Sequence, residues 1–279
     1  MGNTILAFDT KDASLEVVGG KGRSLSEMIN AGLPVPGGFH ITTVAYRDFV
    51  SSNNLQAGIL EEAAKSGQEA VASENISKIF AGTELSTAVA KEIKDAYAQL
   101  GDNLAVAVRS SANAEDLPDM SFAGQQDTYL NIIGEDALLV AVRDCWASLW
   151  TPRAISYRQK MGIEHEQVAM AVVIQLMVAS DVSGILFTAN PATGERTEMI
   201  ANASFGLGEA VVSGQVTPDT YIFDRVERKL KETMIGAKEQ MIVSDGEGGV
   251  IMQEVSKSRR DTSSLSEEHL IGLADLAVK

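Results

Sequence analysis

The chain has 279 residues, of which 45% are hydrophobic and 22% charged, and this composition is that of a globular protein rather than of a disordered or collagen-like chain. The 38 acidic residues outnumber the 23 basic ones, which gives a formal net charge of −15. Nucleic acids and anionic membrane surfaces repel so acidic a chain, and we expect neither as a partner.

The chain has one cysteine, Cys145, in the apolar stretch DCWASLW. This count excludes a disulfide framework within the chain and a zinc site built from cysteines. No segment has the pattern of a signal peptide, and the longest apolar run, 168–174, is too short to span a bilayer. We therefore expect a cytoplasmic protein in which Cys145 is a buried core thiol.

The first half of the chain alternates helical patterns with short strands. Pro34 and Pro36 predict an extended segment before the glycines at 37 and 38. A short apolar strand is predicted to end at Arg109. The predicted helices cover 24–29, 83–100, 134–150 and 152–161, and the predicted strands cover 104–108 and 129–132.

The second half has a different character, because strand patterns separated by Gly, Pro, Asn and Asp turns dominate it. The charged stretch 257–261 is predicted to be a loop, and 266–278 a helix that begins at Ser266. This change predicts two α+β lobes, which we bound at 1–165 and 166–279. The predicted strands of this half cover 168–177, 183–188, 198–203, 220–223, 241–243 and 250–255.

Residues 18–22, Val-Gly-Gly-Lys-Gly, open a predicted helix. Adjacent glycines permit a tight turn whose backbone N–H groups point in one direction. The helix N-terminus and Lys21 add positive charge, and together these features suit a phosphate. The alternative is a plain turn into a helix with a solvated lysine.

The predicted strand 104–108 delivers Arg109 and the hydroxyls of Ser110 and Ser111 into a polar, irregular stretch. Arginine offers a planar fork of donors and stays charged when it is partly desolvated, which suits an anion site. The alternative is a surface arginine at the end of a strand.

Three further segments could contact the same ligand. The polar loop around Gly124 could fold over a polyphosphate, with the Thr128 hydroxyl as a donor, or could satisfy its own hydrogen bonds. Gln175 stands alone in an apolar strand and needs partners, either an adenine edge, with Met177 packing on its face, or neighbouring backbone. A glycine-rich turn before Glu209 could approach the ligand as well.

The three histidines, His40, His165 and His269, are not spaced as metal ligands. No G-x-S-x-G, Walker A or G-x-G-x-x-G motif is present, which disfavours hydrolase triads and P-loop chemistry. We expect each histidine to have a structural role.

Taken together, these stretches resemble one family. The chain is similar to the N-terminal ATP-binding domain of the phosphoenolpyruvate synthase and pyruvate phosphate dikinase family, a domain that rifampicin phosphotransferases share. The matching stretches follow the order of the family along most of the chain: VGGKGRSLSEM (18–28), PVPGGFHITTVAY (34–46), VAVRSSANAEDLPDMSFAGQQDTYLNI (106–132), WASLWTPRAISYR (146–158), VVIQLM (172–177), SGILFTANP (183–191) and SFGLGEAVVSGQVTPDTY (204–221).

The resemblance implies an ATP-grasp-like α+β fold, with mixed or antiparallel sheets and ATP held between two lobes. It implies that Lys21 and Arg109 contact the ATP phosphates and act in catalysis, and that Gly124 and Thr128 belong to a loop that covers those phosphates. The role of Glu209 stays open. The ATP-binding residues that the resemblance implies are Lys21, Arg109, Gly124, Thr128, Gln175, the Met177 backbone and Glu209.

In the family, ATP gives its β-phosphoryl group to a histidine on a separate domain, and AMP is a product. The phosphohistidine then serves an acceptor, which is pyruvate in the synthases and an antibiotic hydroxyl in the rifampicin enzymes. Mg²⁺, lysine and arginine neutralise the charge of the transferred group. We therefore expect ATP and Mg²⁺ as cofactors.

The sequence departs from the family where it ends. In the family the domain continues through an I-E-W-type strand to a Q-S-R-P-type motif, which supply the Mg²⁺ ligands, and this chain ends at Lys279 before either. A phosphohistidine motif and an acceptor domain are also missing. We expect an inactive N-terminal fragment without metal ligands, whose phosphohistidine and acceptor domains lie on the same or a partner chain.

The acceptor stays open at this point. A phosphoenolpyruvate synthase-like dikinase is the leading hypothesis, and a rifampicin phosphotransferase-like enzyme is the second. A nucleotide-binding subunit without phosphotransfer is the third.

Overall fold

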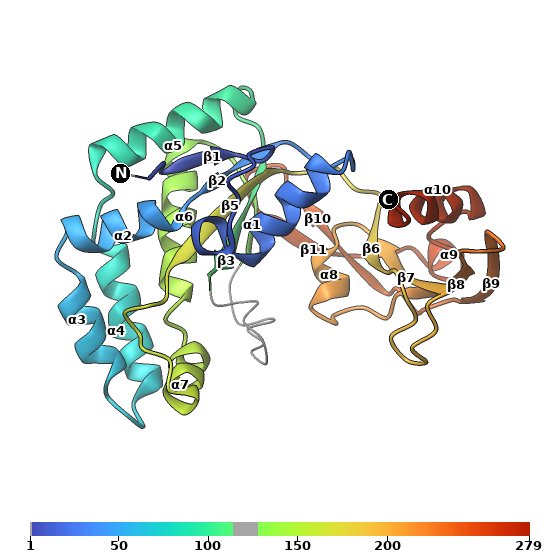
Figure 1. Ribbon diagram of the computed structural model, residues 1–279. Coiled ribbons are helices and arrows are strands. Elements are labelled where there is room, and N and C mark those ends of the chain that lie inside the picture. Colours follow the sequence, from blue (N-terminus) through green and yellow to red (C-terminus); the bar gives the residue numbers. More distant parts are fainter. Residues whose placement is uncertain (1, 114–127) are drawn as a thin grey trace. The chain divides into compact units, whose positions relative to one another are not determined.

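The computed structural model describes residues 2–113 and 128–279. The chain forms two compact units that divide between Met177 and Val178. Both units combine helices with antiparallel strands, which confirms the predicted α+β class (Figure 1).

The first unit is built on a sheet that has, in the described residues, five strands in the order β1-β2-β5-β3-β4. Every neighbouring pair is antiparallel. β5 is central, and its residues 170–174 are all buried, as expected for an apolar strand covered on both faces. The strands are β1 (Ile5–Ala7), β2 (Gly38–Ile41), β3 (Val106–Ala112), β4 (Thr128–Ile132) and β5 (Met170–Leu176).

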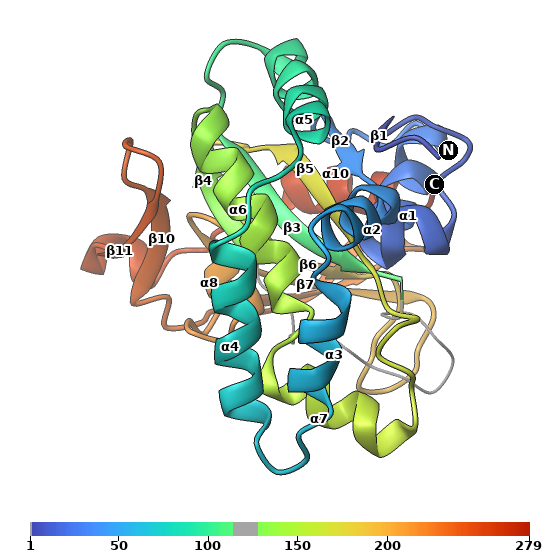
Figure 2. The same ribbon diagram turned by 90° about the vertical axis from the view of Figure 1, so that its left-hand side faces the viewer.

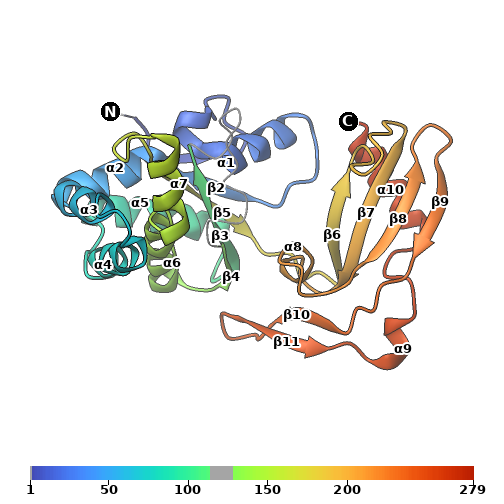
Figure 3. The same cartoon turned by 90° about the horizontal axis from the view of Figure 1, so that it is seen from below.

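Different helices cover the two faces of this sheet, because successive side chains of a strand point to opposite faces. Val173 packs with Leu25 of α1, whereas its neighbours Val172 and Ile174 belong to the large core that contains Trp146 of α6. Figure 3 shows α1 and α6 on opposite sides of the strands. The helices are α1 (Leu15–Asn30), α2 (Thr43–Ser52), α3 (Gln56–Ala63), α4 (Glu69–Ala81), α5 (Thr87–Leu100), α6 (Glu135–Ser148) and α7 (Pro152–Met161).

Strand β3 is longer than its apolar run predicts, so the prediction that Arg109 ends the strand is wrong. Arg109 lies opposite Thr128 of β4 and Val173 of β5, and β5 continues to pair with β3 as far as Ala112. The two serines that follow Arg109 are therefore buried strand residues and not loop residues. Backbone pairing with β5 therefore extends β3 beyond the apolar side chains that predict it.

The predicted boundary between the lobes, at 165/166, falls before β5. The compact units divide twelve residues or so later, after Met177, because β5 pairs with β2 and β3 of the first unit. Figure 2 shows β5 among the strands of that unit. Cys145 is a buried thiol in the core of this unit, as predicted.

The second unit, all of whose residues are described, has an antiparallel four-stranded sheet in the order β6-β7-β8-β9 and a separate hairpin of β10 and β11. Its core joins Met199, Tyr221 and Phe223 of the sheet to Leu270 and Ala274 of α10. Its elements are β6 (Val182–Phe187), β7 (Glu198–Phe205), α8 (Glu209–Val212), β8 (Asp219–Asp224), β9 (Lys229–Met234), β10 (Gln240–Ser244), β11 (Val250–Glu254), α9 (Lys257–Arg260) and α10 (Glu267–Ala277).

The predicted loop over 257–261 is wrong for most of its length, because α9 covers Lys257–Arg260. The Arg260 side chain holds this turn by donating through Nε to the Val255 carbonyl over 2.7 Å. The helix predicted to begin at Ser266 is confirmed, and the Ser266 hydroxyl caps it by accepting from the His269 N–H. In the described part of the chain, no helix combines the length and the apolar character of a membrane span.

Candidate functional site

Polar side chains gather on one face of the sheet of the first unit. Side chains directly opposite each other in paired strands share a face, and every second residue of a strand returns to it. Arg109 lies opposite Thr128 and Val173, so Gln175 of β5 and Ser111 of β3 share that face. This is the face that α1 covers, since Val173 packs against Leu25.

Arg109 and Gln175 are hydrogen-bonded to each other on this face. Arg109 donates through Nη1 to Oε1 of Gln175 over 3.1 Å, and both side chains are half-buried. The lone polar residue of β5 thus has one of the partners that an apolar strand requires it to find. The bond joins two residues that the sequence assigns to opposite ends of one nucleotide.

The glycine-rich segment lies inside α1 and interrupts it. Gly19 has φ 69° and ψ 179°, so the helix is kinked there, and the part that carries Lys21 begins anew at Gly20. A Cβ at position 19 would lie 2.2 Å from the carbonyl oxygen of Ser111, a distance that no side chain tolerates. The close approach of α1 to β3 therefore requires glycine.

Ser111 fastens this kink to the sheet. Its hydroxyl donates to the Val18 carbonyl over 2.7 Å and accepts from the Gly22 N–H over 3.1 Å, so it satisfies one backbone group on each side of the kink. Ser111 is fully buried and stands two residues beyond Arg109. The strand that carries Arg109 thus holds the segment that carries the half-buried Lys21.

The backbone around Met177 is tied to two neighbouring segments. The Leu176 N–H donates to the Gly37 carbonyl over 2.8 Å, and the Met177 N–H donates to the Ala105 carbonyl over 2.9 Å. The Met177 peptide has therefore used its only donor, and its carbonyl is the group that could accept from a base. This places a hydrogen-bond acceptor two residues from Gln175.

Thr128 and Gly124 belong to one predicted loop. Thr128 is exposed and is the first residue of β4, directly opposite Arg109. Gly124 lies outside the described residues.

Glu209 belongs to the second unit. It opens the short helix α8 after a turn at Gly206, whose φ is 79° and where a Cβ would lie 2.4 Å from the Ile242 carbonyl oxygen. The Leu207 N–H donates to that same carbonyl over 2.8 Å. The glycine turn is thus fixed against β10, and a role for Glu209 with the residues of the first unit stays a prediction.

The histidines were expected to be structural, and two of them do make buried contacts. His40 is fully buried beneath α1, and burial lowers its pKa to about 4. His165 accepts through Nδ1 from Nε of the buried Arg158 over 2.9 Å, and burial lowers its pKa as well. His269 is exposed.

The sequence does not reveal the role of Ser111. Ser111 shares a face of the sheet with Arg109, and this becomes visible only once β3 is known to continue beyond Arg109.

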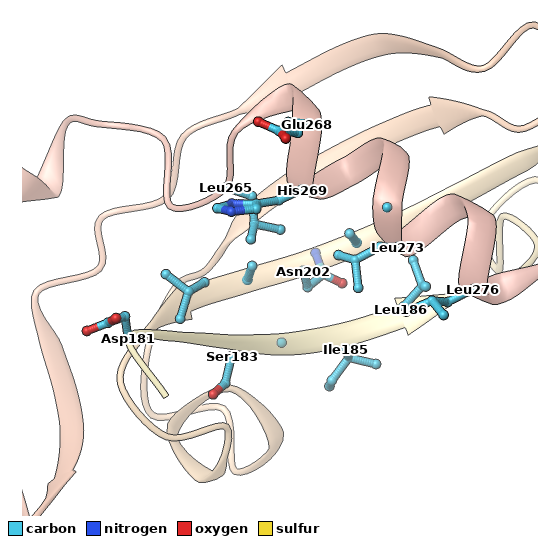
Figure 4. Close-up of a pocket in the computed structure, with 15 residues that line it drawn as sticks. Asp181, Ser183, Ile185, Leu186, Asn202, Leu265, Glu268, His269, Leu273 and Leu276 are labelled. Carbon is cyan, nitrogen blue, oxygen red and sulfur yellow. The ribbon is translucent and has the colours of Figure 1, made fainter. Parts of the chain in front are cut away.

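The second unit has a cavity of about 850 Å³ between β6, β7 and α10. Figure 4 shows Leu273 and Leu276 of α10 beside Leu186 of β6 there, and its polar residues include Asn202 and His269. None of the predicted site residues that the structure describes lines this cavity. In the same described residues, no group of three or more His, Cys, Asp or Glu side chains is placed to hold a metal ion.

Comparison with known proteins gives one consistent result. The family model described as the pyruvate phosphate dikinase AMP/ATP-binding domain matches residues 15–279. A probable phosphoenolpyruvate synthase of Archaeoglobus fulgidus is 44% identical over 277 residues, which cover 96% of this chain and 36% of the relative. A probable phosphoenolpyruvate synthase of Pyrococcus horikoshii is 41% identical, over 94% of this chain and 38% of the relative.

A relative with a different name matches almost as well. The rifampicin phosphotransferase of Bacillus cereus is 40% identical over 98% of this chain and 32% of its own length. The chain thus spans about a third of the curated relatives it matches.

Proposed function

Because the chain belongs to the pyruvate phosphate dikinase AMP/ATP-binding domain family, we propose that it binds ATP on the α1-covered face of its first unit and presents it for phosphoryl transfer. The observation that carries this proposal is the Arg109–Gln175 hydrogen bond beside the Ser111-anchored glycine segment. Together they gather a guanidinium, an amide and a helix start on one face of a sheet.

Different residues contact different parts of the nucleotide in this proposal. Arg109 and Lys21 neutralise the charge of the phosphates, Arg109 through its planar donor fork and Lys21 as a point charge. Gln175 and the Met177 carbonyl address the base, since one offers an amide and the other an acceptor. By resemblance to the family, Thr128 and Gly124 are assigned to a segment that covers the phosphates, although Gly124 lies outside the described residues. Glu209 keeps its predicted part in ATP binding.

The family resemblance supports an ATP-grasp-like arrangement, and each unit supplies the α+β architecture and antiparallel sheet that such a fold needs. The resemblance also implies Mg²⁺. No carboxylate cluster among the described residues fits that ion, so we assign none of them to it. We place the protein in the cytoplasm, which the single buried cysteine supports.

The reaction we propose for the full enzyme is that of a phosphoenolpyruvate synthase: ATP, pyruvate and water give phosphoenolpyruvate, AMP and phosphate through a phosphohistidine. The names of the two archaeal relatives support it. The 40% identity to a rifampicin phosphotransferase supports an antibiotic hydroxyl as the alternative acceptor. In both cases the reaction also needs a phosphohistidine domain and an acceptor domain, from the same protein or from a partner, and we expect the 279 residues by themselves to be inactive.

Titration calorimetry of the 279-residue chain with ATP tests the proposal. We expect saturable binding, and we expect Arg109→Ala to weaken it by roughly tenfold or more, because a charged hydrogen bond to phosphate contributes about 1.5–3 kcal/mol. Arg153→Ala is the matched control, since Arg153 is exposed on α7 and belongs to no part of the candidate site. Equal ATP affinity of the Arg109 and Arg153 variants would remove Arg109 from the site.

A further inference from the structure

His40 lies at the middle of the α1-covered face. In β2 it stands opposite Leu6 of β1 and Val173 of β5, so it shares the face of Arg109 and Gln175. It is fully buried, and its ring lies 4.7 Å from that of Phe8, tilted by 46°. The ring is therefore held in place by β2 and by its aromatic neighbour before any contact with α1 is considered.

The imidazole spans one turn of α1. Its Nε2 lies 3.0 Å from the Ser26 hydroxyl, which is itself buried. Its Nδ1 lies 3.2 Å from the point where a Cβ of residue 22 would be, and this nitrogen has no hydrogen-bond partner among the described residues. His40 thus contacts α1 at Gly22 and at Ser26, immediately after Lys21.

The same stretch of α1 is held from a second strand. Ser111 of β3 binds the Val18 carbonyl and the Gly22 N–H, whereas His40 of β2 binds Ser26 and abuts Gly22. The two strands are separated by β5 in the sheet. Two fixed points on different strands prevent the helix from sliding or turning on the sheet, and Lys21 lies between Val18 and Ser26, the outermost of these contacts.

A histidine at this buried position destabilises the protein if the ring only fills space. Buried polar atoms destabilise a protein unless they are hydrogen-bonded, and Nδ1 has no such bond here. Burial keeps the ring neutral by lowering its pKa to about 4. What the imidazole adds over an apolar ring of similar size is the directional bond to Ser26.

We propose that His40 is a positioning residue that fixes the glycine-rich segment 19–22 of α1, so that Lys21 is presented to the nucleotide. The inference rests on the proposed ATP site. It makes His40 a determinant of ATP affinity although the ring is buried beneath α1.

Four variants of the 279-residue chain test this inference in ATP titrations. His40→Phe keeps a ring but removes the bond to Ser26, and Ser26→Ala removes the same bond from its other end. We expect each to weaken ATP binding about fivefold, the worth of one neutral hydrogen bond. His40→Gln can reach Ser26 with its amide and should restore affinity to within about twofold of the original. His269→Phe, at an exposed histidine of the second unit, should change nothing.

A double variant separates positioning from general packing. His40→Phe and Ser26→Ala remove one and the same bond, so the double variant should bind ATP no more weakly than either single variant. The amide resonance of Gly22 in ¹H–¹⁵N spectra should shift in both single variants and return in His40→Gln. If His40→Phe does not fold, Ser26→Ala and the Gly22 resonance carry the test.

Two results would overturn the inference, and a third would overturn the proposed function as well. ATP affinities of His40→Phe and Ser26→Ala equal to that of the unchanged chain would show that the contact does not position Lys21. Additive losses in the double variant would show two separate packing defects. If the unchanged chain binds no ATP, the proposed function fails and the inference falls with it.

Discussion

Arg109 and Gln175 lie diagonally across the β3–β5 ladder, and their hydrogen bond of 3.1 Å links them on one face of the sheet. Arg109 is directly opposite Val173, and Gln175 is directly opposite Ala107. A long side chain reaches such a diagonal neighbour easily. The bond turns the amide oxygen of Gln175 toward the guanidinium, so the amide NH₂ is the donor that remains for another partner.

Replacing Gln175 with glutamate should weaken ATP binding more than replacing it with methionine. A carboxylate at this position pairs with Arg109 and so competes with the phosphates for the guanidinium, whereas methionine only removes a hydrogen bond. We expect a loss of at least about tenfold for Gln175→Glu and about fivefold for Gln175→Met, measured by calorimetry. Equal affinities of the two variants would show that the ligand does not sense the charge at residue 175.

Gly19→Ala should destabilise the first unit and abolish ATP binding. The residue has φ 69°, and its new Cβ would meet the Ser111 carbonyl oxygen at 2.2 Å, so α1 must leave β3. We expect the free energy of unfolding to fall by about 2–4 kcal/mol, measured by urea denaturation.

Gly32→Ala is the control for Gly19. Its φ is 76°, but nothing lies within 4 Å of its Cβ position. This variant incurs only the backbone cost of about 1–2 kcal/mol and should bind ATP normally. Similar losses of ATP affinity in both variants would mean that the contact with Ser111 is not what makes Gly19 necessary.

How far the sequence predicts the structure depends on the origin of each element. The apolar strand 170–176 and the amphipathic helix 87–100 follow from local patterns. The strand is predicted to within two residues at each end, and the helix is predicted to its last residue but begins four residues later than predicted. The extension of β3 through Arg109 follows from pairing with β5, which no local pattern contains. Helices α2 to α4 have short apolar stripes that become evident once Phe49, Ile76 and Phe80 are seen in one core.

The candidate site divides in the same way. The residue types of Lys21, Arg109 and Gln175 are compatible with a phosphate and a base, and the family resemblance assigns them these roles. The sequence does not show how these residues are connected in space. The connection runs through Ser111 and through a diagonal hydrogen bond between strands that are distant in sequence. The sequence predicts a structural role for His40 because the histidines are not spaced as metal ligands. Its place beneath Gly22 becomes visible only once α1 is packed on the sheet.

Lys238→Met should destabilise the second unit strongly. Lys238 and Asp219 form a fully buried ion pair, and Asp219 also accepts from the N–H groups of Gly236 and Ser264. Removing the lysine leaves a buried carboxylate without its cation, which costs about 3–5 kcal/mol. Calorimetry should show the transition of the second unit at lower temperature.

The Lys238–Asp219 pair should also make the stability of the second unit fall at acidic pH. Burial alone would raise the pKa of Asp219, but the hydrogen bonds from Lys238, Ser264 and Gly236 together hold it below its ordinary value. Because the folded pKa is depressed, this stabilisation is present above about pH 4 and is lost as the pH falls further. An unfolding midpoint of Lys238→Met equal to that of the unchanged chain at pH 7 would contradict the assignment.

The stability of the first unit should fall as the pH decreases from 6.5 to 5, and His40 should cause a defined part of that fall. Burial lowers the pKa of His40 to about 4, so between about pH 4 and 6.5 the unfolded chain binds a proton that the folded chain does not. The free energy of unfolding should therefore drop by about 1.5 kcal/mol more in the unchanged chain than in His40→Gln. Urea titrations followed by tryptophan fluorescence isolate this unit, since both tryptophans, Trp146 and Trp150, lie in its core. His165, whose pKa burial also lowers, titrates in both proteins and cancels from the difference. Parallel stability profiles of the two proteins over this range would show that His40 takes up its proton in the folded state as readily as in the unfolded one.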